Sequence, residues 1–200
     1  MKTSLKVFKV FVDIDKEEVY LNEMANKGYF LKKYSAFGFY HFFKDQPQDL
    51  YYRVDYRQFR KRSDFEDYKA LFEDAGWQHV YGTRYSLNQY FLPKSADAGK
   101  DIFSTKESAA VRYKTLYQMC YLNVFVALVF IFGFDWSDVS FLTPGLWEMS
   151  GPKFLSAFLF ELPFVALRAC SALFFLILGI VYAVWSVKAK KIYNSLMANE

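Results

Sequence analysis

Cysteine and histidine are scarce in this sequence of 200 residues, which contains two of each. Cys120 and Cys170 both lie inside apolar stretches and form no Cys-x-x-Cys pair, which excludes a disulfide framework and a cysteine-based zinc or redox motif. His41 and His79 lie in separate strand-like segments, without the three or four spaced ligands that a metal site needs. We therefore expect no metal and no cofactor, and we expect both cysteines to be small packing residues.

Catalytic and phosphate-binding motifs are also missing. The sequence has no glycine-rich phosphate loop, no G-x-S-x-G and no H-E-x-x-H motif, so it predicts no enzyme. The formal charge of +4 is small, and no nucleic-acid recognition motif accompanies it, so direct nucleic-acid binding is not expected. At the N-terminus, Lys6 and Lys9 interrupt the apolar positions, which excludes the continuous apolar segment of about 7–15 residues found in a signal peptide.

Apolar and charged residues are both abundant, at 54% hydrophobic, 22% aromatic and 23% charged. A uniform globule does not need both, so the composition indicates one water-soluble part and one part in lipid. Residues 115–134 carry no charge, and at about 1.5 Å per residue this stretch spans a bilayer core of roughly 30 Å. Residues 169–187 form a second uncharged stretch. The sequence therefore predicts two transmembrane helices.

Lysine and arginine are concentrated on the two outer sides of this pair of spans. Basic residues precede the first span at Lys100, Lys106, Arg112 and Lys114, and follow the second at Lys188, Lys190 and Lys191. The positive-inside rule then places both termini in the cytoplasm of a multi-pass protein of the cell membrane. The expected organisation is a cytoplasmic domain (1–94), a juxtamembrane connector (95–114), the first span, an extracytoplasmic loop (135–168), the second span and a cytoplasmic tail (188–200).

The apolar segment 154–168 within this loop allows two interpretations. Pro163 provides a natural break, which favours an interfacial or re-entrant helix that leads into the second span. Alternatively, the second span begins near residue 156 and places Glu161 in lipid, where an acid is a candidate functional group. Glu161 and Arg168 are therefore candidate intramembrane or interfacial polar residues, and a lipid-modifying enzyme using both is a minor hypothesis.

The water-soluble part shows an internal repeat with an offset of 48 residues, the separation of Gly28 and Gly76 (76 − 28). Both glycines follow a helical pattern, at the place where a positive φ angle usually ends a helix. At the same offset, Asp15 and Ser63 are expected to be N-cap residues, with Glu18 and Glu66 completing capping boxes. Each helix is flanked by one strand-like segment before it and two after it. We expect an α+β fold of two strand–helix–strand–strand copies, with one mainly antiparallel six-stranded sheet and both helices on one face.

Two groups of charged residues are candidate contacts for a partner or for lipid. Arg53 and Asp55 share one face of the strand "YYRVDY", where they form either a solvated ion pair or a polar anchor for a peptide or lipid headgroup. The segment "RQFRKR" contains the second group, Arg57, Arg60, Lys61 and Arg62. Anionic lipid attracts such residues, and we expect this group to lie before the second helix.

The sequence resembles a bacterial, mainly Gram-positive, family of membrane proteins of unknown function in six stretches that occur in the same order. These stretches are "YLNEMANKGYFL", "GFYHF", "YYRVDY", "LFEDAGWQHV", "YFLPK" and "DIFSTKESAAVRYK". The resemblance covers about the first 115 residues and implies a cytoplasmic domain followed by membrane spans. Members of that family are often encoded beside PadR-type transcriptional regulators. The resemblance thus implies a regulatory protein that binds a PadR-like partner, and the alternative is an accessory subunit of a transporter or other membrane complex.

Overall fold

The computed structural model describes residues 4–35, 37–94, 101–133, 142 and 144–198, apart from the side chains of residues 168 and 169. The chain divides into two compact units. The first comprises Met1–Tyr117 together with Lys188–Glu200, and the second comprises Gln118–Val187. The first unit therefore includes residues 95–114, which the sequence analysis assigned to a connector.

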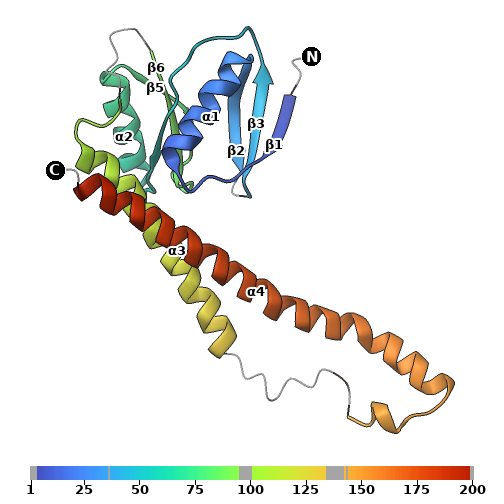
Figure 1. Cartoon of the computed structure of the whole chain (residues 1–200). Coiled ribbons are helices and arrows are strands. Elements are labelled where there is room, and N and C mark those ends of the chain that lie inside the picture. Colours follow the sequence, from blue (N-terminus) through green and yellow to red (C-terminus); the bar gives the residue numbers. More distant parts are fainter. Residues whose placement is uncertain (1–3, 36, 95–100, 134–141, 143, 199–200) are drawn as a thin grey trace. The chain divides into compact units, whose positions relative to one another are not determined.

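The first unit is an α+β domain, as expected, with eight elements before the long helices (Figure 1). In chain order these are β1 (Ser4–Phe8), α1 (Ile14–Asn26), β2 (Tyr29–Ser35), β3 (Phe39–Lys44), β4 (Arg53–Tyr56), α2 (Arg62–Asp74), β5 (Trp77–Tyr81) and β6 (Asn88–Pro93). The strands form two antiparallel sheets, sheet A in the order β1-β3-β2 and sheet B in the order β4-β6-β5. The element order strand–helix–strand–strand thus occurs twice.

The expectation of one six-stranded sheet is wrong, because the strands pair in two sets of three. The strands β2 and β5 contact each other, and both are irregular. The register shifts between Leu31 and Lys33 in β2 and between His79 and Tyr81 in β5. Such bulges increase the local twist and disrupt the ladder.

The two helices that pack on these sheets begin earlier than expected. The N-cap residue of α1 is Asp13, which accepts a hydrogen bond from the Lys16 amide at 3.5 Å, and α2 follows Lys61 without a side-chain cap. The predicted N-caps Asp15 and Ser63, and the capping boxes with Glu18 and Glu66, are therefore wrong. The predicted ends of the helices are confirmed, because Gly28 and Gly76 have φ angles of +80° and +85°.

Each helix buries one apolar face. In α1, Ile14, Leu21 and Ala25 are buried, and this helix contacts β2 and β4 and so touches both sheets. In α2, Phe65 and Tyr68 pack with Trp77 and Phe91 of sheet B. Aromatic side chains fill most of this core, as the strand composition predicts.

Two long apolar helices follow, α3 (Lys106–Gly133) and α4 (Pro152–Ala198), with a short 3₁₀ helix at Leu146–Glu148 before α4. Both are long and apolar enough to cross a membrane, which is weak support for membrane association. The break expected at Pro163 is wrong, because α4 is continuous through it. A proline in a membrane helix is tolerated when neighbouring groups satisfy the backbone group that it frees. Most of the loop between α3 and the 3₁₀ helix, including 134–141, lies outside the described residues.

Candidate functional site

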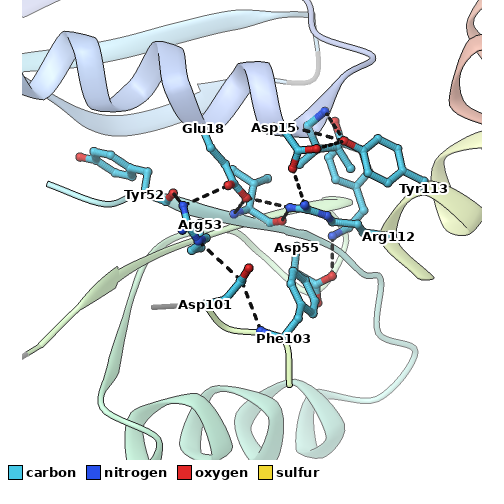
Figure 2. A network of polar contacts seen from close by, with 12 residues as sticks. Asp15, Glu18, Tyr52, Arg53, Asp55, Asp101, Phe103, Arg112 and Tyr113 are labelled. Atoms are coloured by element: carbon cyan, nitrogen blue, oxygen red, sulfur yellow. Dashed lines mark hydrogen bonds and ion pairs between the residues drawn. The ribbon is translucent and has the colours of Figure 1, made fainter. Parts of the chain in front are cut away.

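The first turns of α3 insert two buried side chains, Arg112 and Tyr113, among α1 and β4 (Figure 2). The guanidinium of Arg112 donates hydrogen bonds from Nη1 to Glu18 Oε1 at 2.7 Å and from Nη2 to Asp15 Oδ1 at 2.6 Å. Only 6% of the Arg112 side chain and 9% of the Glu18 side chain are exposed. A buried ion pair loses its hydration on both sides, so it depends on close geometry of this kind.

The pair of Glu18 and Arg112 also occupies the edge of strand β4, which is the outer strand of sheet B. Glu18 Oε1 accepts a hydrogen bond from the Val54 amide at 3.0 Å, and Arg112 Nη1 donates one to the Val54 carbonyl at 3.1 Å. One acceptor and one donor thus meet the two backbone groups of Val54, as a neighbouring strand would. An open strand edge invites pairing with other chains, and this ion pair closes it.

Tyr113 performs a similar role at the start of α1. Its hydroxyl accepts hydrogen bonds from the amides of Ile14 at 3.1 Å and Asp15 at 3.3 Å, and it donates to the carboxylate of Asp15 at 3.1 Å. The first amides of a helix have no partner within the helix. The hydroxyl of a residue on α3 therefore completes the N-terminus of α1, which lies almost one hundred residues earlier in the chain.

Arg53 and Asp55, the predicted polar pair of β4, have other partners in this network. Arg53 Nη1 donates to Glu18 Oε2 at 3.2 Å, and Arg53 Nε lies 3.6 Å from a carboxylate oxygen of Asp101. Asp55 is buried and accepts hydrogen bonds from the Tyr68 hydroxyl and the Tyr56 amide, both at 2.8 Å. The description of Asp55 as a solvated residue is wrong, since only 3% of its side chain is exposed.

The predicted basic group at residues 57–62 is exposed. Arg57 differs from the others because its Nε lies 3.5 Å from Asp55 Oδ2 and its guanidinium lies over the Tyr68 ring. Arg62 is the first residue of α2, so the expectation that the whole group precedes the helix is wrong. Arg60, Lys61 and Arg62 remain a compact positive surface at a helix N-terminus, where the helix dipole disfavours them.

A second buried acid, Glu17, connects the two sheets. Its Oε1 accepts hydrogen bonds from the hydroxyls of Tyr40 in β3 and Tyr90 in β6, both at 2.7 Å. Burial raises the pKa of Glu17 from its ordinary value of 4.5 to about 7, although the two tyrosine hydrogen bonds act in the opposite direction. Burial likewise raises the pKa of Glu18, and the positive charge of Arg112 limits the rise.

The remaining predicted residues lie apart from this network. His79 contacts Gln89 at 3.0 Å, and burial lowers the pKa of its imidazole. Within the part of the chain that the structure describes, no group of three histidine, cysteine or acidic side chains could hold a metal ion. Glu161 lies in α4 and is half-buried, and the side chain of Arg168 lies outside the described residues. The network therefore links α1, β4 and the first turns of α3, and its tyrosine hydroxyls are hydrogen-bonded to carboxylates.

Several residues of the network were not identified from the sequence as parts of a site, among them Asp15, Glu17, Glu18, Arg112 and Tyr113. Arg112 counted only as a basic residue before the first span, and Glu18 only as part of a capping box. The available signal was Arg112 next to Tyr113 in the charged stretch that directly precedes the uncharged residues 115–134.

Comparison with known families gives a match to the family described as "Protein of unknown function (DUF2812)", over residues 13–125. Comparison with curated proteins and with solved structures gives no match. The matched segment includes α1, both sheets apart from β1, and the part of α3 that carries Arg112 and Tyr113. Because it covers more than half of the 200 residues, the chain belongs to the DUF2812 family of proteins of unknown function.

Proposed function

We propose that the protein is a membrane-anchored interaction protein whose α+β domain lies in the cytoplasm and binds a protein partner. In this proposal, α3 and α4 are transmembrane helices and both chain termini are cytoplasmic. The observation that carries the proposal is the burial of Arg112 and Tyr113, at the start of an apolar helix, within the hydrogen-bond network of the domain. A domain attached in this way responds as one body to whatever moves the helix.

The proposed partner is a transcriptional regulator of the PadR type. This choice of partner rests on the resemblance to a bacterial family whose members are often encoded beside such regulators. The protein would then couple the state of the cell envelope to transcription. An interaction role agrees with the contacts of the site, in which buried acids accept hydrogen bonds from arginine and from tyrosine hydroxyls.

A second candidate function is that of an accessory subunit in a transporter or another membrane complex. Large apolar side chains on both long helices favour it, because they are exposed in the second unit, for example Phe125, Phe132, Phe174 and Ile177. Such side chains need either lipid or another membrane protein as a neighbour.

The proposal includes an internal duplication of the domain. The start residues of α1 and α2 differ by 48 (62 − 14), and those of β2 and β5 also differ by 48 (77 − 29). The two glycines that end the helices share the same offset and the same sign of φ. These agreements support descent of both halves from one strand–helix–strand–strand unit.

Affinity purification of the full chain in mild detergent, followed by mass spectrometry, tests the two candidates. An Arg112→Met variant disturbs the domain, and Lys114→Met removes the same charge from an exposed position two residues along α3. A regulator bound through the domain dissociates at a lower urea concentration from Arg112→Met than from Lys114→Met, because the Arg112→Met domain is less stable and unfolds first. Transporter subunits bound through the long helices are retained by both variants and would support the second candidate instead.

A further inference from the structure

Among the residues that the structure describes, one face of sheet A has no helix packed against it. The opposite face carries Tyr40 and Phe42, which are buried, and Tyr40 reaches Glu17 of α1. The register pairs Lys6 with His41 and Phe8 with Phe39, and these residues alternate with the buried ones. Side chains of directly paired residues lie on the same side of a sheet, so Lys6, Phe8, Phe39 and His41 share the face turned away from α1.

This open face ends in an apolar tip, which we define as Phe8, Val10 and Phe37. Exposed fractions are 64% for Phe8, 40% for Val10 and 82% for Phe37. Phe8 and Val10 meet at Gly38, since the position of a Cβ on Gly38 would lie 2.8 Å from Val10 Cγ2 and 3.2 Å from Phe8 Cε2, and Phe37 directly precedes Gly38 in the chain. The Lys9 amide also donates to the Gly38 carbonyl at 2.9 Å, which joins the end of β1 to the turn between β2 and β3.

The charge around the tip has one sign. Residues 4–12 and 29–44, which contain all three strands of sheet A, include five lysines and no aspartate or glutamate. These lysines are Lys6, Lys9, Lys32, Lys33 and Lys44, and all are exposed. Lys6 Nζ lies 4.1 Å from the centre of the Phe39 ring, and Lys9 Nζ lies 4.1 Å from the centre of the Tyr20 ring. Lys6 is therefore adjacent to an aromatic ring of the open face, whereas Lys9, which follows Phe8 at the tip, lies against α1.

From this arrangement we infer that the tip and the lysines of sheet A form a docking surface for an anionic membrane, with Phe8, Val10 and Phe37 in the headgroup region and Lys6, Lys9 and Lys33 against the lipid phosphates. Apolar side chains beside lysines are the features that hold proteins at the membrane interface. The inference rests on the proposed membrane anchor, because a tethered domain meets the bilayer at a high effective concentration. It assigns this role to sheet A in place of the basic group at residues 57–62.

A single-stranded nucleic acid is the principal alternative occupant, since it also binds cations and aromatic rings. The structure favours lipid for two reasons. The most exposed ring, Phe37, lies on the turn and away from the row of paired residues, and the aliphatic Val10 offers no stacking surface. The rings of Phe39 and Phe43, which do lie on the sheet face, are half-buried.

The test uses the full chain in lipid nanodiscs, in a background where serine replaces Cys120 and Cys170. A cysteine at position 37 (Phe37→Cys) carries an environment-sensitive fluorophore, and spin-labelled lipids quench it on contact. We expect quenching in nanodiscs containing phosphatidylglycerol and little quenching in phosphatidylcholine alone. Replacing Lys6, Lys9 and Lys33 with glutamine lowers the quenching to the phosphatidylcholine level.

The matched control replaces Arg60, Lys61 and Arg62 with glutamine, which removes the same number of charges from exposed positions. It leaves the quenching at position 37 unchanged. Equal losses in the two triple variants, or no quenching with phosphatidylglycerol, overturn the inference. A second experiment measures binding of a fluorescent single-stranded RNA of 20 nucleotides. If RNA binding is lost only in the variant at Lys6, Lys9 and Lys33, and no lipid quenching occurs at position 37, the surface binds nucleic acid instead.

A second labelled position separates failure of this inference from failure of the proposed anchor. Val126 is an exposed residue of α3 in the second unit. A fluorophore at Val126→Cys is quenched in both kinds of nanodisc if α3 crosses the bilayer. Quenching at 126 without quenching at 37 overturns the docking surface alone, whereas absence of quenching at 126 overturns the membrane anchor and the docking surface together.

Discussion

Replacement of Arg112 by methionine tests the role of the buried ion pair most directly. Methionine keeps much of the volume and the helix propensity of arginine, so the change removes mainly the charge and its hydrogen bonds. Glu18 then loses its contact at 2.7 Å while it stays buried, and the Val54 carbonyl loses its donor at 3.1 Å. We expect the domain to become less stable without a change in fold.

The size of the loss follows from the partners that remain. Removing one member of a buried ion pair typically costs about 3–5 kcal/mol, because the other charge stays buried without compensation. Arg53 still donates to Glu18 Oε2 at 3.2 Å, which places the expected loss near the lower limit, at about 3 kcal/mol. Domains of this kind are stable by roughly 5–15 kcal/mol, so the loss is a large fraction of the total.

Urea unfolding of the full chain in mild detergent, measured by pulse proteolysis, reports this loss. The matched control is Lys114→Met, whose side chain is exposed, and it should change the stability by less than about 0.5 kcal/mol. Adding Glu18→Gln to Arg112→Met removes the uncompensated charge and retains an acceptor for the Val54 amide. We expect the double variant to recover about 1–2 kcal/mol relative to Arg112→Met. Equal stabilities of Arg112→Met and Lys114→Met would refute the assignment of Arg112 as a structural anchor.

Three further predictions concern pH, backbone geometry and topology. The pKa of Glu17 is about 7 in the folded protein and 4.5 ordinarily, so the folded state binds the proton more tightly and loses up to about 3 kcal/mol of stability as the pH rises from 4.5 to 7. Glu17→Gln should abolish this slope in urea unfolding and be more stable than the wild type at pH 8, and an unchanged slope contradicts the assignment. Gly28→Val should lower the free energy of unfolding by more than about 1 kcal/mol and so lower the melting temperature, because φ is +80° and the new Cβ would lie 2.5 Å from the Asp45 carbonyl oxygen. A melting temperature equal to that of the wild type would contradict this reasoning. Ser150→Cys, in a background without the two native cysteines, should react with an impermeant thiol reagent in intact cells, whereas reaction at Ser95→Cys instead reverses the proposed topology.

The parts of the fold that depend on nearby residues were predictable from the sequence. Gly28 and Gly76 end their helices with positive φ angles because few other residues adopt that conformation at low cost. The two long apolar helices follow from composition alone. The division into two sheets was not predictable in this way, because it depends on which strands pair over long distances in the chain, and no local pattern indicates the register shifts at Leu31–Lys33 and His79–Tyr81.

The candidate site was harder to predict because its members are far apart in the chain. Arg112 and Glu18 are separated by 94 residues, and each has an adequate local explanation, one as a charge beside a membrane span and the other as a helix cap. Asp13 rather than Asp15 caps α1, which leaves Asp15 to bind Arg112 and Tyr113. Local rules assigned each acid to the nearest helix end, whereas the folded chain uses them to bind α3.

The completion of β4 and α1 by residues of α3 has a consequence for biosynthesis. All six strands have been synthesised when the ribosome reaches Pro93, but Arg112 is added 19 residues later (112 − 93). At about 5–20 residues per second, the nascent domain waits roughly 1–4 s for that residue. During this interval the edge of β4 is open and Glu18 lacks its principal cation, which is the condition under which strands pair with other chains. Translation speed across residues 94–112 therefore sets how long the edge of β4 stays open before Arg112 can close it.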